Sequence, residues 1–280
     1  MVFTEASFYI RGSRSAKNWS EAPCIDTMTF SRVLSTANAG NGCRENGWTV
    51  VEADANQVVV SKGGLQLNIH PGECESRDAS LHAGSTVSLR LSKELLNASP
   101  RYYMALGNCG DVAAAAFPLV RLYWNLRAAG AVKFVESFTR LLNRGGIHFR
   151  LKVLNDPAIY ARCDAGVLYF YKADHCAVSE AVAALYSSIA PFLNADVPVF
   201  TRRIAPGLGL AEDPGTQESF GQHRCRILSE GIIRAHAEKA KFLNDRMRIV
   251  ESQFASEGTR LSEPHLNPCS EDHYTFTHLG

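Results

Sequence analysis

The chain has 280 residues, of which 46% are hydrophobic and 20% are charged, as in ordinary soluble globular proteins. Its 29 basic and 28 acidic side chains give a formal net charge of +1, which excludes a global attraction to nucleic acid or to an anionic membrane. Any recognition of an anion must therefore come from a local cluster of cations.

The sequence has no evident export signal. Residues 1–10 lack a basic segment followed by a long apolar stretch, and the longest apolar run, residues 112–120, is interrupted by Pro118 and is too short to span a bilayer. The eight cysteines are scattered singly, without C-x-x-C spacing, and we interpret them as reduced thiols. We therefore expect a cytoplasmic protein.

The N-terminal half predicts short antiparallel strands. An irregular lead-in, residues 1–45, contains one expected helix at residues 28–37. From Trp48 onward the segments are short and β-rich, and Lys62-Gly63-Gly64 is a predicted hairpin turn. The expected strands are residues 48–51, 58–61, 65–70, 87–91 and 102–106.

The remainder of the chain is predicted to be mainly helical. Helices are expected at residues 112–129, 132–143 and 175–193, and two more follow the capping box of Ser219 and Gln222, ending near residue 257. Strands at residues 149–154 and 166–171, with a helix starting at Asp156-Pro157 between them, predict a β-α-β unit, and a further strand at 197–202 precedes a loop at 206–215. We therefore expect an α+β fold. An antiparallel β meander in the N-terminal half packs with the helical half, and residues 46–280 form a single domain.

Motifs for common cofactors and metals are missing from the sequence. The histidines show no H-x-x-x-H spacing, G-x-S-x-G and Walker patterns are absent, and Gly207-Leu208-Gly209 lacks the rest of a dinucleotide fingerprint. We expect no metal and no organic cofactor. The candidates that remain are cations beside glycines and polar residues.

Two of these candidates lie in the predicted meander. Lys62 adjoins a turn whose backbone amides could approach a ligand, although a hairpin lysine is more often simply solvated. Strand alternation places Arg90 with Ser88 and Ser92 on one face, and Lys93 falls at the end of the strand. The alternative for Arg90 is a solvated outer face.

Two further candidates lie in the middle of the chain. On the predicted helix, Arg121, Trp124 and Asn125 occupy one face, either as part of a site or as an interhelical hydrogen-bond cluster. On the strand at residues 149–154, Lys152 shares a face with Arg150, and a structural ion pair with nearby Asp156 explains the pattern nearly as well as a catalytic lysine.

The last candidate is the helix that starts at Ser219. His223 and Arg224 lie beside its first turn, where free backbone amides already favour an anion. The structural alternative is that Glu212 and Asp213, in the preceding loop, supply the compensating acid.

Several segments, in the same order, resemble the HopA-like family. They are Tyr102-Tyr103-Met104-Ala105-Leu106-Gly107-Asn108, Arg121-Leu122-Tyr123-Trp124-Asn125, Leu151-Lys152-Val153-Leu154-Asn155-Asp156-Pro157, Cys163-Asp164-Ala165-Gly166-Val167-Leu168-Tyr169, Gly207-Leu208-Gly209-Leu210-Ala211-Glu212-Asp213-Pro214 and Ser219-Phe220-Gly221-Gln222-His223-Arg224-Cys225. The family includes type III secreted effectors and stand-alone lyase-like proteins encoded beside kinase-like proteins in class V lanthipeptide and thioamide-peptide pathways. The resemblance extends from about Trp48 to Tyr274.

The resemblance implies a lyase that eliminates phosphate from phosphoserine or phosphothreonine in a ribosomal precursor peptide, leaving dehydroalanine or dehydrobutyrine. A separate kinase-like protein would first phosphorylate the peptide, and a cyclase is a further candidate partner. Neither nucleic acid nor a membrane is expected as a partner. The alternatives are a noncatalytic adaptor that binds and presents the peptide, and a type III effector that acts on host signalling.

Such an elimination needs a base for the Cα proton, cations for the developing enolate and a stabilised phosphate leaving group. A lysine can be the base only when burial or nearby positive charge depresses its pKa. We therefore assign the candidate roles from chemistry. The base is Lys62, Lys93 or Lys152, the acid is His223 or His70, the phosphate ligands are Arg90, Arg121 and Arg224, and Tyr123 and Asn125 orient the peptide.

Overall fold

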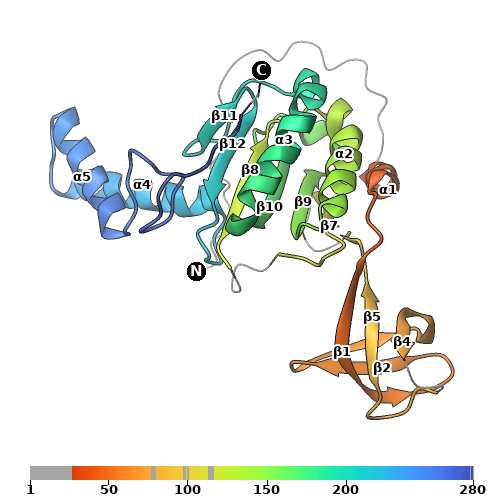
Figure 1. The fold of residues 1–280 in the computed structure, drawn as a ribbon. Helices are drawn as coiled ribbons and strands as arrows, with labels where there is room; N and C mark the ends of the chain where they lie inside the picture. Colours follow the sequence, from red (N-terminus) through yellow and green to blue (C-terminus); the bar gives the residue numbers. More distant parts are fainter. Residues whose placement is uncertain are drawn as a thin grey trace.

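The computed structural model describes residues 27–76, 80–96, 99, 101–112, 117–277 and 279. These residues form two antiparallel sheets, of five and seven strands, together with five α-helices (Figure 1). The predicted α+β class is confirmed. Residues 1–26 of the predicted lead-in lie outside the described residues.

The smaller sheet comes first in the chain and has its own core. Its strands, in the spatial order β3-β2-β1-β5-β4, are β1 (Cys43–Ala53), β2 (Val58–Lys62), β3 (Leu65–Ile69), β4 (Cys74–Ser76) and β5 (Thr86–Leu91). Trp48, Val60 and Leu89 are buried in this core. The turn between β2 and β3 is the predicted one, because Gly63 and Gly64 take positive φ angles of 55° and 82°, as a two-residue hairpin of this type requires.

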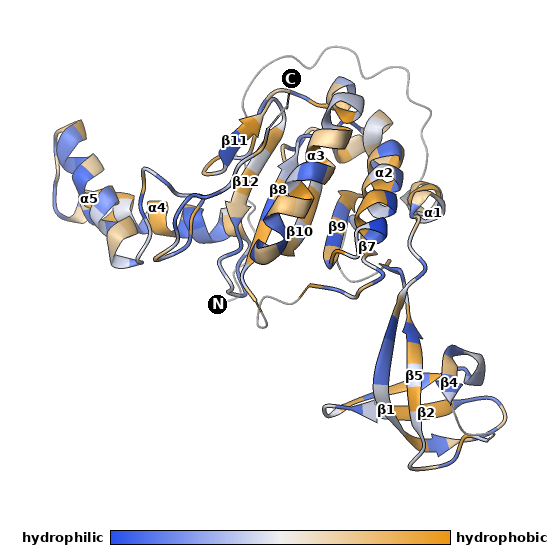
Figure 2. Cartoon of the chain, in the orientation of Figure 1, coloured by the Kyte–Doolittle hydropathy of each residue, from blue (hydrophilic) through white to orange (hydrophobic). Residues whose placement is uncertain are grey.

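The larger sheet forms the body of the molecule. Its strands, in the order β11-β12-β8-β10-β9-β7-β6, are β6 (Glu94–Leu95), β7 (Tyr102–Leu106), β8 (Leu119–Trp124), β9 (Phe149–Leu154), β10 (Gly166–Tyr171), β11 (Arg202–Ala205) and β12 (Leu208–Glu212). The helices α2 (Ala131–Arg144) and α3 (His175–Ile189) cover one face (Figure 1). Figure 2 shows hydrophobic and hydrophilic residues alternating along α2, as in a helix with one buried side.

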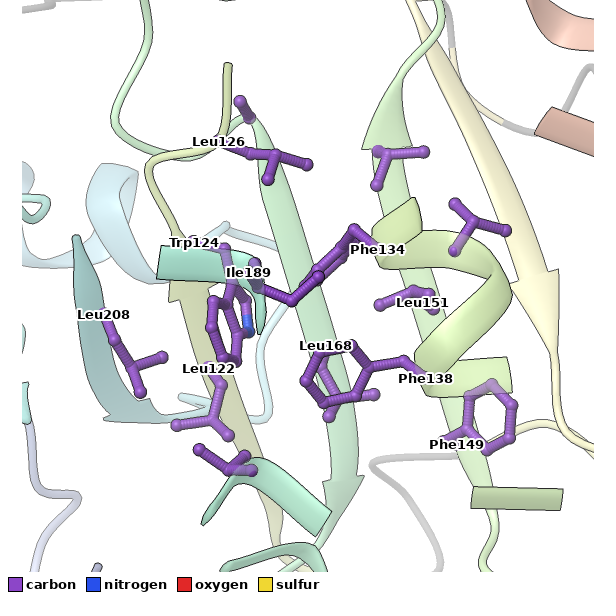
Figure 3. Close-up of a cluster of buried hydrophobic side chains, with 14 of the residues drawn as sticks. Leu122, Trp124, Leu126, Phe134, Phe138, Phe149, Leu151, Leu168, Ile189 and Leu208 are labelled. Atoms are coloured by element: carbon purple, nitrogen blue, oxygen red, sulfur yellow. The ribbon is translucent and has the colours of Figure 1, made fainter. Parts of the chain in front are cut away.

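Aromatic side chains fill the space between the larger sheet and its helices. The centroid of the Trp124 ring, from β8, lies 5.3 Å from the centroid of the Phe134 ring and 5.2 Å from that of the Phe138 ring, both of α2 (Figure 3). Leu151 of β9 and Leu168 of β10 are fully buried beside them. Because alternate residues of a strand point to opposite faces, this packing fixes which side chains β8, β9 and β10 present on the other face of the sheet.

The remaining helices flank the larger sheet. The first, α1 (Thr27–Ala37), confirms the helix expected at residues 28–37. Both helices expected after Ser219 are present as α4 (Phe220–Ala237) and α5 (Leu243–Ser256), and Ser219 and Gln222 form the predicted capping box. Within the described residues, no helix combines the length and the apolar character needed to cross a bilayer.

The helix predicted at residues 112–129 is wrong. Residues 113–116 lie outside the described residues, and residues 119–124 form strand β8 near the centre of the larger sheet. Every residue of β8 is buried, so the period-2 alternation of a half-exposed strand does not appear in the sequence. As a consequence Arg121, Tyr123 and Asn125 follow the strand period, whereas Trp124 points into the core.

Two other predicted connections also differ. The segment between β9 and β10 contains a single 3₁₀ turn (Pro157–Ile159), and the two strands pair antiparallel, so they form a hairpin rather than a β-α-β crossover. The strand expected at residues 197–202 begins at Arg202, and the predicted loop at 206–215 contains β12. A tight turn at Pro206 and Gly207 joins β11 to β12.

Candidate functional site

The face of the larger sheet opposite α2 and α3 carries a cluster of cations, which we call the cationic face: Arg121, Arg150, Lys152 and Arg162. In the ladder, Tyr169 of β10 lies opposite Arg121 of β8 on one side and Arg150 of β9 on the other. Two residues earlier on β10, Val167 lies opposite Tyr123 of β8 on one side and Lys152 of β9 on the other. The three adjacent strands therefore place these residues in two neighbouring rows that run across the sheet, one through Tyr169 and one through Val167.

Lys152 is the half-buried amine of this cationic face. Its Nζ lies 3.8 Å from the centroid of the Tyr102 ring, which comes from β7. Burial lowers the pKa of Lys152 to about 8; Asp164 opposes this shift, and Arg121, Arg162 and Arg150 lower the pKa further. A substantial fraction of Lys152 is thus neutral near neutral pH.

Each guanidinium of the cationic face is held by a carboxylate. The Nε atoms of Arg121, Arg150 and Arg162 donate to Asp213 at 2.7 Å, to Asp111 at 2.8 Å and to Asp164 at 2.8 Å, respectively. Three carboxylates therefore balance three guanidiniums and leave Lys152 as the excess cation. The pairs also fix the direction of each guanidinium.

Tyrosines lie between the guanidiniums. The Tyr169 ring centroid is 5.1 Å from Cζ of Arg121 and 5.9 Å from Cζ of Arg150, and Nη1 of Arg121 donates to the Tyr123 hydroxyl at 3.5 Å. Burial raises the pKa of both Tyr123 and Tyr169. Both hydroxyls consequently keep their protons near neutral pH.

Lys62 and Lys93 are engaged in structural contacts away from this face. Nζ of Lys62, on the smaller sheet, donates to Glu45 and to the Asn46 carbonyl, both at 2.8 Å. Nζ of Lys93 donates to the Ser35 carbonyl at 3.0 Å and to the Asn38 carbonyl at 2.9 Å, which ties the end of α1 to the segment before β6. Of the three candidate bases, only Lys152 lies among several cations.

Arg90 and His70 also belong to the smaller sheet. Arg90 is exposed on the outer face of β5, as the structural alternative predicted, and lies 3.7 Å from Glu75. His70 caps the 3₁₀ turn Pro71–Glu73, and its Nδ1 accepts from the Gly72 amide at 3.2 Å. The structure therefore does not bring either residue together with Lys152.

Arg224 is completely buried and binds backbone carbonyls. Its Nε donates to Pro264 at 2.7 Å and its Nη2 to Leu266 at 2.8 Å, so it anchors the segment that follows α5. Its Nη1 lies 2.6 Å from Nδ1 of His223, whose pKa is lowered by burial and by this guanidinium. These contacts account for Arg224 without a bound anion.

The acids proposed to compensate Arg224 have other direct partners. Glu212 accepts hydrogen bonds from Lys172 and from the Tyr274 hydroxyl, both at 2.7 Å, and Asp213 holds Arg121. Asn125 likewise has a structural role, because its side chain donates to the Asp196 carbonyl at 2.9 Å and accepts from Asn194 at 3.2 Å. Arg121 and Tyr123 are thus the assigned polar residues that share the face with Lys152.

Several residues on or beside the cationic face were not identified as candidates from the sequence. Arg162 and Asp164 lie in the β9–β10 connection, and Tyr102 and Tyr169 were noted only as parts of motifs. His148 shares the strand face of Arg150 and Lys152, and its ring lies 5.8 Å from that of Tyr171. Extending the alternation of β9 by one residue at its start would have identified His148.

Two surface cavities lie elsewhere. One, of about 360 Å³, is lined by Tyr186, Leu193 and Pro206 among others, and one of about 310 Å³ is lined by residues that follow α5, such as Arg260 and Ser270. Neither is lined by Lys152, Arg121 or Arg150. These two cavities are therefore separate from the cationic face.

Comparison with known proteins gives a family match. Residues 95–266 match the HopA1 effector protein family, a span narrower than the one expected from the motifs, 48–274. The matched span includes the whole of the larger sheet except for Glu94 and contains every member of the cationic face. No curated protein matches the chain.

Two solved structures are similar in fold. The effector protein from Pseudomonas syringae pv. tomato strain DC3000 is 15% identical, with a TM-score of 0.53 over 86% of this chain and 81% of that chain. The effector protein from Pseudomonas syringae pv. syringae strain 61 is 15% identical, with a TM-score of 0.46 over 62% of this chain and 66% of that chain. At this level of identity the first similarity shows a shared fold.

Proposed function

The chain belongs to the HopA1 effector protein family, and from this membership and the chemistry of the cationic face we propose that it is a phosphoserine/phosphothreonine lyase. Its substrate is a ribosomal precursor peptide, phosphorylated by a separate kinase-like protein during lanthipeptide or thioamitide maturation. The observation that carries the proposal is Lys152, a half-buried amine with a pKa lowered to about 8 beside three guanidiniums.

Lys152 supplies the base. With a pKa of about 8, roughly one tenth of the amine is neutral at pH 7, compared with well under one thousandth for a lysine at its ordinary pKa of about 10.4. Nζ takes the Cα proton of the phosphorylated residue, and the electron pair of the broken C–H bond forms the Cα=Cβ double bond. The basicity lost through the lowered pKa is small beside the gain in the neutral fraction.

The guanidiniums supply the leaving-group chemistry. As the Cβ–O bond breaks, its electron pair goes to the phosphate oxygen, and Arg121 and Arg150 stabilise the charge that develops there. The departing phosphate takes up one proton, which balances the proton that Nζ removed from Cα. The fixed direction of each guanidinium, set by Asp213 and Asp111, means that little reorganisation is needed when the charge appears.

Tyrosines and the ion pairs position the peptide in this proposal. The protonated hydroxyl of Tyr123 lies in the same row as Lys152 and can donate to the carbonyl of the phosphorylated residue, where enolate charge accumulates. Neutral Lys152 is the group that changes charge during the reaction. The surrounding ion pairs keep the rest of the face close to electrically balanced.

Co-expression tests the proposal. A candidate precursor peptide is expressed with the kinase-like protein, with and without this chain, and the peptide masses are compared. We expect phosphorylated peptide without the chain, and with it a peptide that has lost phosphoric acid and carries dehydroamino acids detectable by thiol addition.

Two other outcomes would contradict the proposal. Recovery of unmodified serine or threonine would identify hydrolysis, and therefore a phosphatase. Phosphopeptide that stays intact but co-purifies with the chain would identify a noncatalytic adaptor.

A further inference from the structure

Among the described residues, strand β3 is a sheet edge without the usual protection. Of the four edge strands in the described sheets, β4 and β6 are only three and two residues long, and β11 begins with Arg202 and Arg203. Short strands and charges are the usual protection of a sheet edge against pairing with another chain. β3, with the sequence Leu-Gln-Leu-Asn-Ile, has five residues and no charge, bulge or proline.

The hairpin register determines which backbone N–H and C=O groups of β3 point toward β2 and which point away from the sheet. In a two-residue hairpin the residues that flank the turn, here Lys62 and Leu65, form a hydrogen-bonded pair, and such pairs then alternate along the ladder. Leu65, Leu67 and Ile69 therefore direct their N–H and C=O groups to β2. Gln66 and Asn68 direct theirs outward, and no backbone hydrogen bond from another described segment reaches them.

The apolar side chains of β3 form a surface that is only partly covered. Leu67 and Ile69 are partly buried against the core of the smaller sheet, whereas Leu65 is 55% exposed. All three side chains lie on one face, because they alternate with Gln66 and Asn68. A strand added to this edge would extend the apolar face and cover Leu65.

The sequence of β3 is complementary to itself in antiparallel pairing. With Leu67 opposite the Leu67 of a second copy, Gln66 falls opposite Asn68, and Leu65 falls opposite Ile69. Apolar residues then meet apolar residues, amides meet amides, and no charges are opposed. Gln66 and Asn68 are also the residues whose outward backbone groups are in register to exchange hydrogen bonds, two for each of the two symmetric pairs.

We propose that β3 pairs with β3 of a second copy of this chain, joining two five-stranded sheets into one ten-stranded antiparallel sheet about a two-fold axis. Such an interface is isologous and closes at two copies. The smaller sheet projects from the rest of the molecule (Figure 1), and Gln66 and Asn68 are exposed. The inference does not depend on the proposed lyase activity, because the cationic face lies on the other sheet.

Sedimentation equilibrium of the full chain tests the pairing. A contact of this size lies at the weak end of protein interfaces, and we expect a monomer–dimer equilibrium with a dissociation constant of roughly 10–100 µM. Gln66→Pro removes the outward N–H while leaving the ladder to β2 intact, so each dimer loses two hydrogen bonds. The dissociation constant is expected to rise by about 30-fold.

The control is Gln66→Ala, which keeps the N–H and should dimerise like the wild type. A second measurement avoids dependence on any variant: hydrogen exchange at the Gln66 and Asn68 amides should slow as the wild-type concentration rises. A wild type that stays monomeric at several hundred micromolar would overturn the proposal. So would equal dimerisation of Gln66→Pro and wild type. A monomeric wild type that binds a peptide, when Gln66→Pro does not bind it, would also overturn the proposal and identify β3 as a peptide-binding edge.

Discussion

The ammonium of Lys152 lies 3.8 Å from the centroid of the Tyr102 ring, and the guanidinium carbon of Arg162 lies 5.8 Å from the same centroid. The ring covers Nζ and excludes water from one side, but its attraction for a cation is modest compared with the hydration it replaces. Two cations beside one ring also repel each other. This arrangement contributes to the lowered pKa of Lys152.

The first prediction concerns the pH dependence of elimination. Since only neutral Lys152 can accept the Cα proton, kcat/KM should rise about tenfold per pH unit below the pKa of Lys152 and level off above about pH 8. Initial rates on a phosphothreonine peptide between pH 5.5 and 9.5 measure this. A profile that is flat over that range would exclude Lys152 as the titrating base.

Changing a neighbouring charge should move that profile. Asp164 raises the pKa of Lys152, so Asp164→Asn should shift the midpoint to lower pH. Asp164→Glu keeps the negative charge and is the matched control, expected to titrate like the wild type. A purely structural role for Asp164 would lower the rate without moving the midpoint, which separates the two interpretations.

The half-buried amine of Lys152 should also lower the stability of the folded protein. The pKa of Lys152 in the folded protein, about 8, is below its unfolded value, so the unfolded state binds more protons between about pH 8 and 10.4 and stability rises with pH in that window. Lys152→Met should therefore stabilise the protein by about 1–2 kcal/mol below pH 8, a figure that allows for partial solvent screening. The gain should shrink toward pH 10. Urea unfolding at pH 6.5 and 9.5 measures it, and a gain that grows with pH would contradict the assignment.

Two arginines predicted as phosphate ligands should behave differently from each other. Arg224→Met leaves the carbonyls of Pro264 and Leu266 without their donor and should destabilise the protein by about 3 kcal/mol in urea unfolding. Arg90→Ala removes an exposed side chain and should change stability by less than about 0.5 kcal/mol and leave elimination unchanged. Loss of elimination activity in Arg90→Ala would place the site on the smaller sheet.

Local sequence signals predicted most of the regular elements. The glycine pair at the β2–β3 turn, the capping box at Ser219 and the alternation of β5 and β9 each depend on a few neighbouring residues, and each was confirmed. The alternation of β9 also placed Lys152 beside Arg150. These features can be predicted because turns, caps and strand faces are set by local backbone geometry.

The cationic face could not be predicted in full, because it depends on strand order. Arg121 reaches the face only because β8 is a strand that pairs with β10, and burial on both sides hid its period. Arg162 and Asp164 lie in an irregular connection, where no periodicity points to a neighbour. Conversely, Lys62 and Arg90 looked equivalent to Lys152 and Arg121 in sequence, and only the division into two sheets separates them.

The most direct measurement is the mass of a synthetic phosphothreonine peptide after incubation with the purified chain, alone and with Lys152→Met and Lys62→Met. We predict loss of phosphoric acid with the wild type and with Lys62→Met, and a rate lower by about 100-fold or more with Lys152→Met. Intact phosphopeptide with every protein, or elimination by Lys152→Met at the wild-type rate, would contradict the assignment of Lys152 as the base of a phosphothreonine lyase.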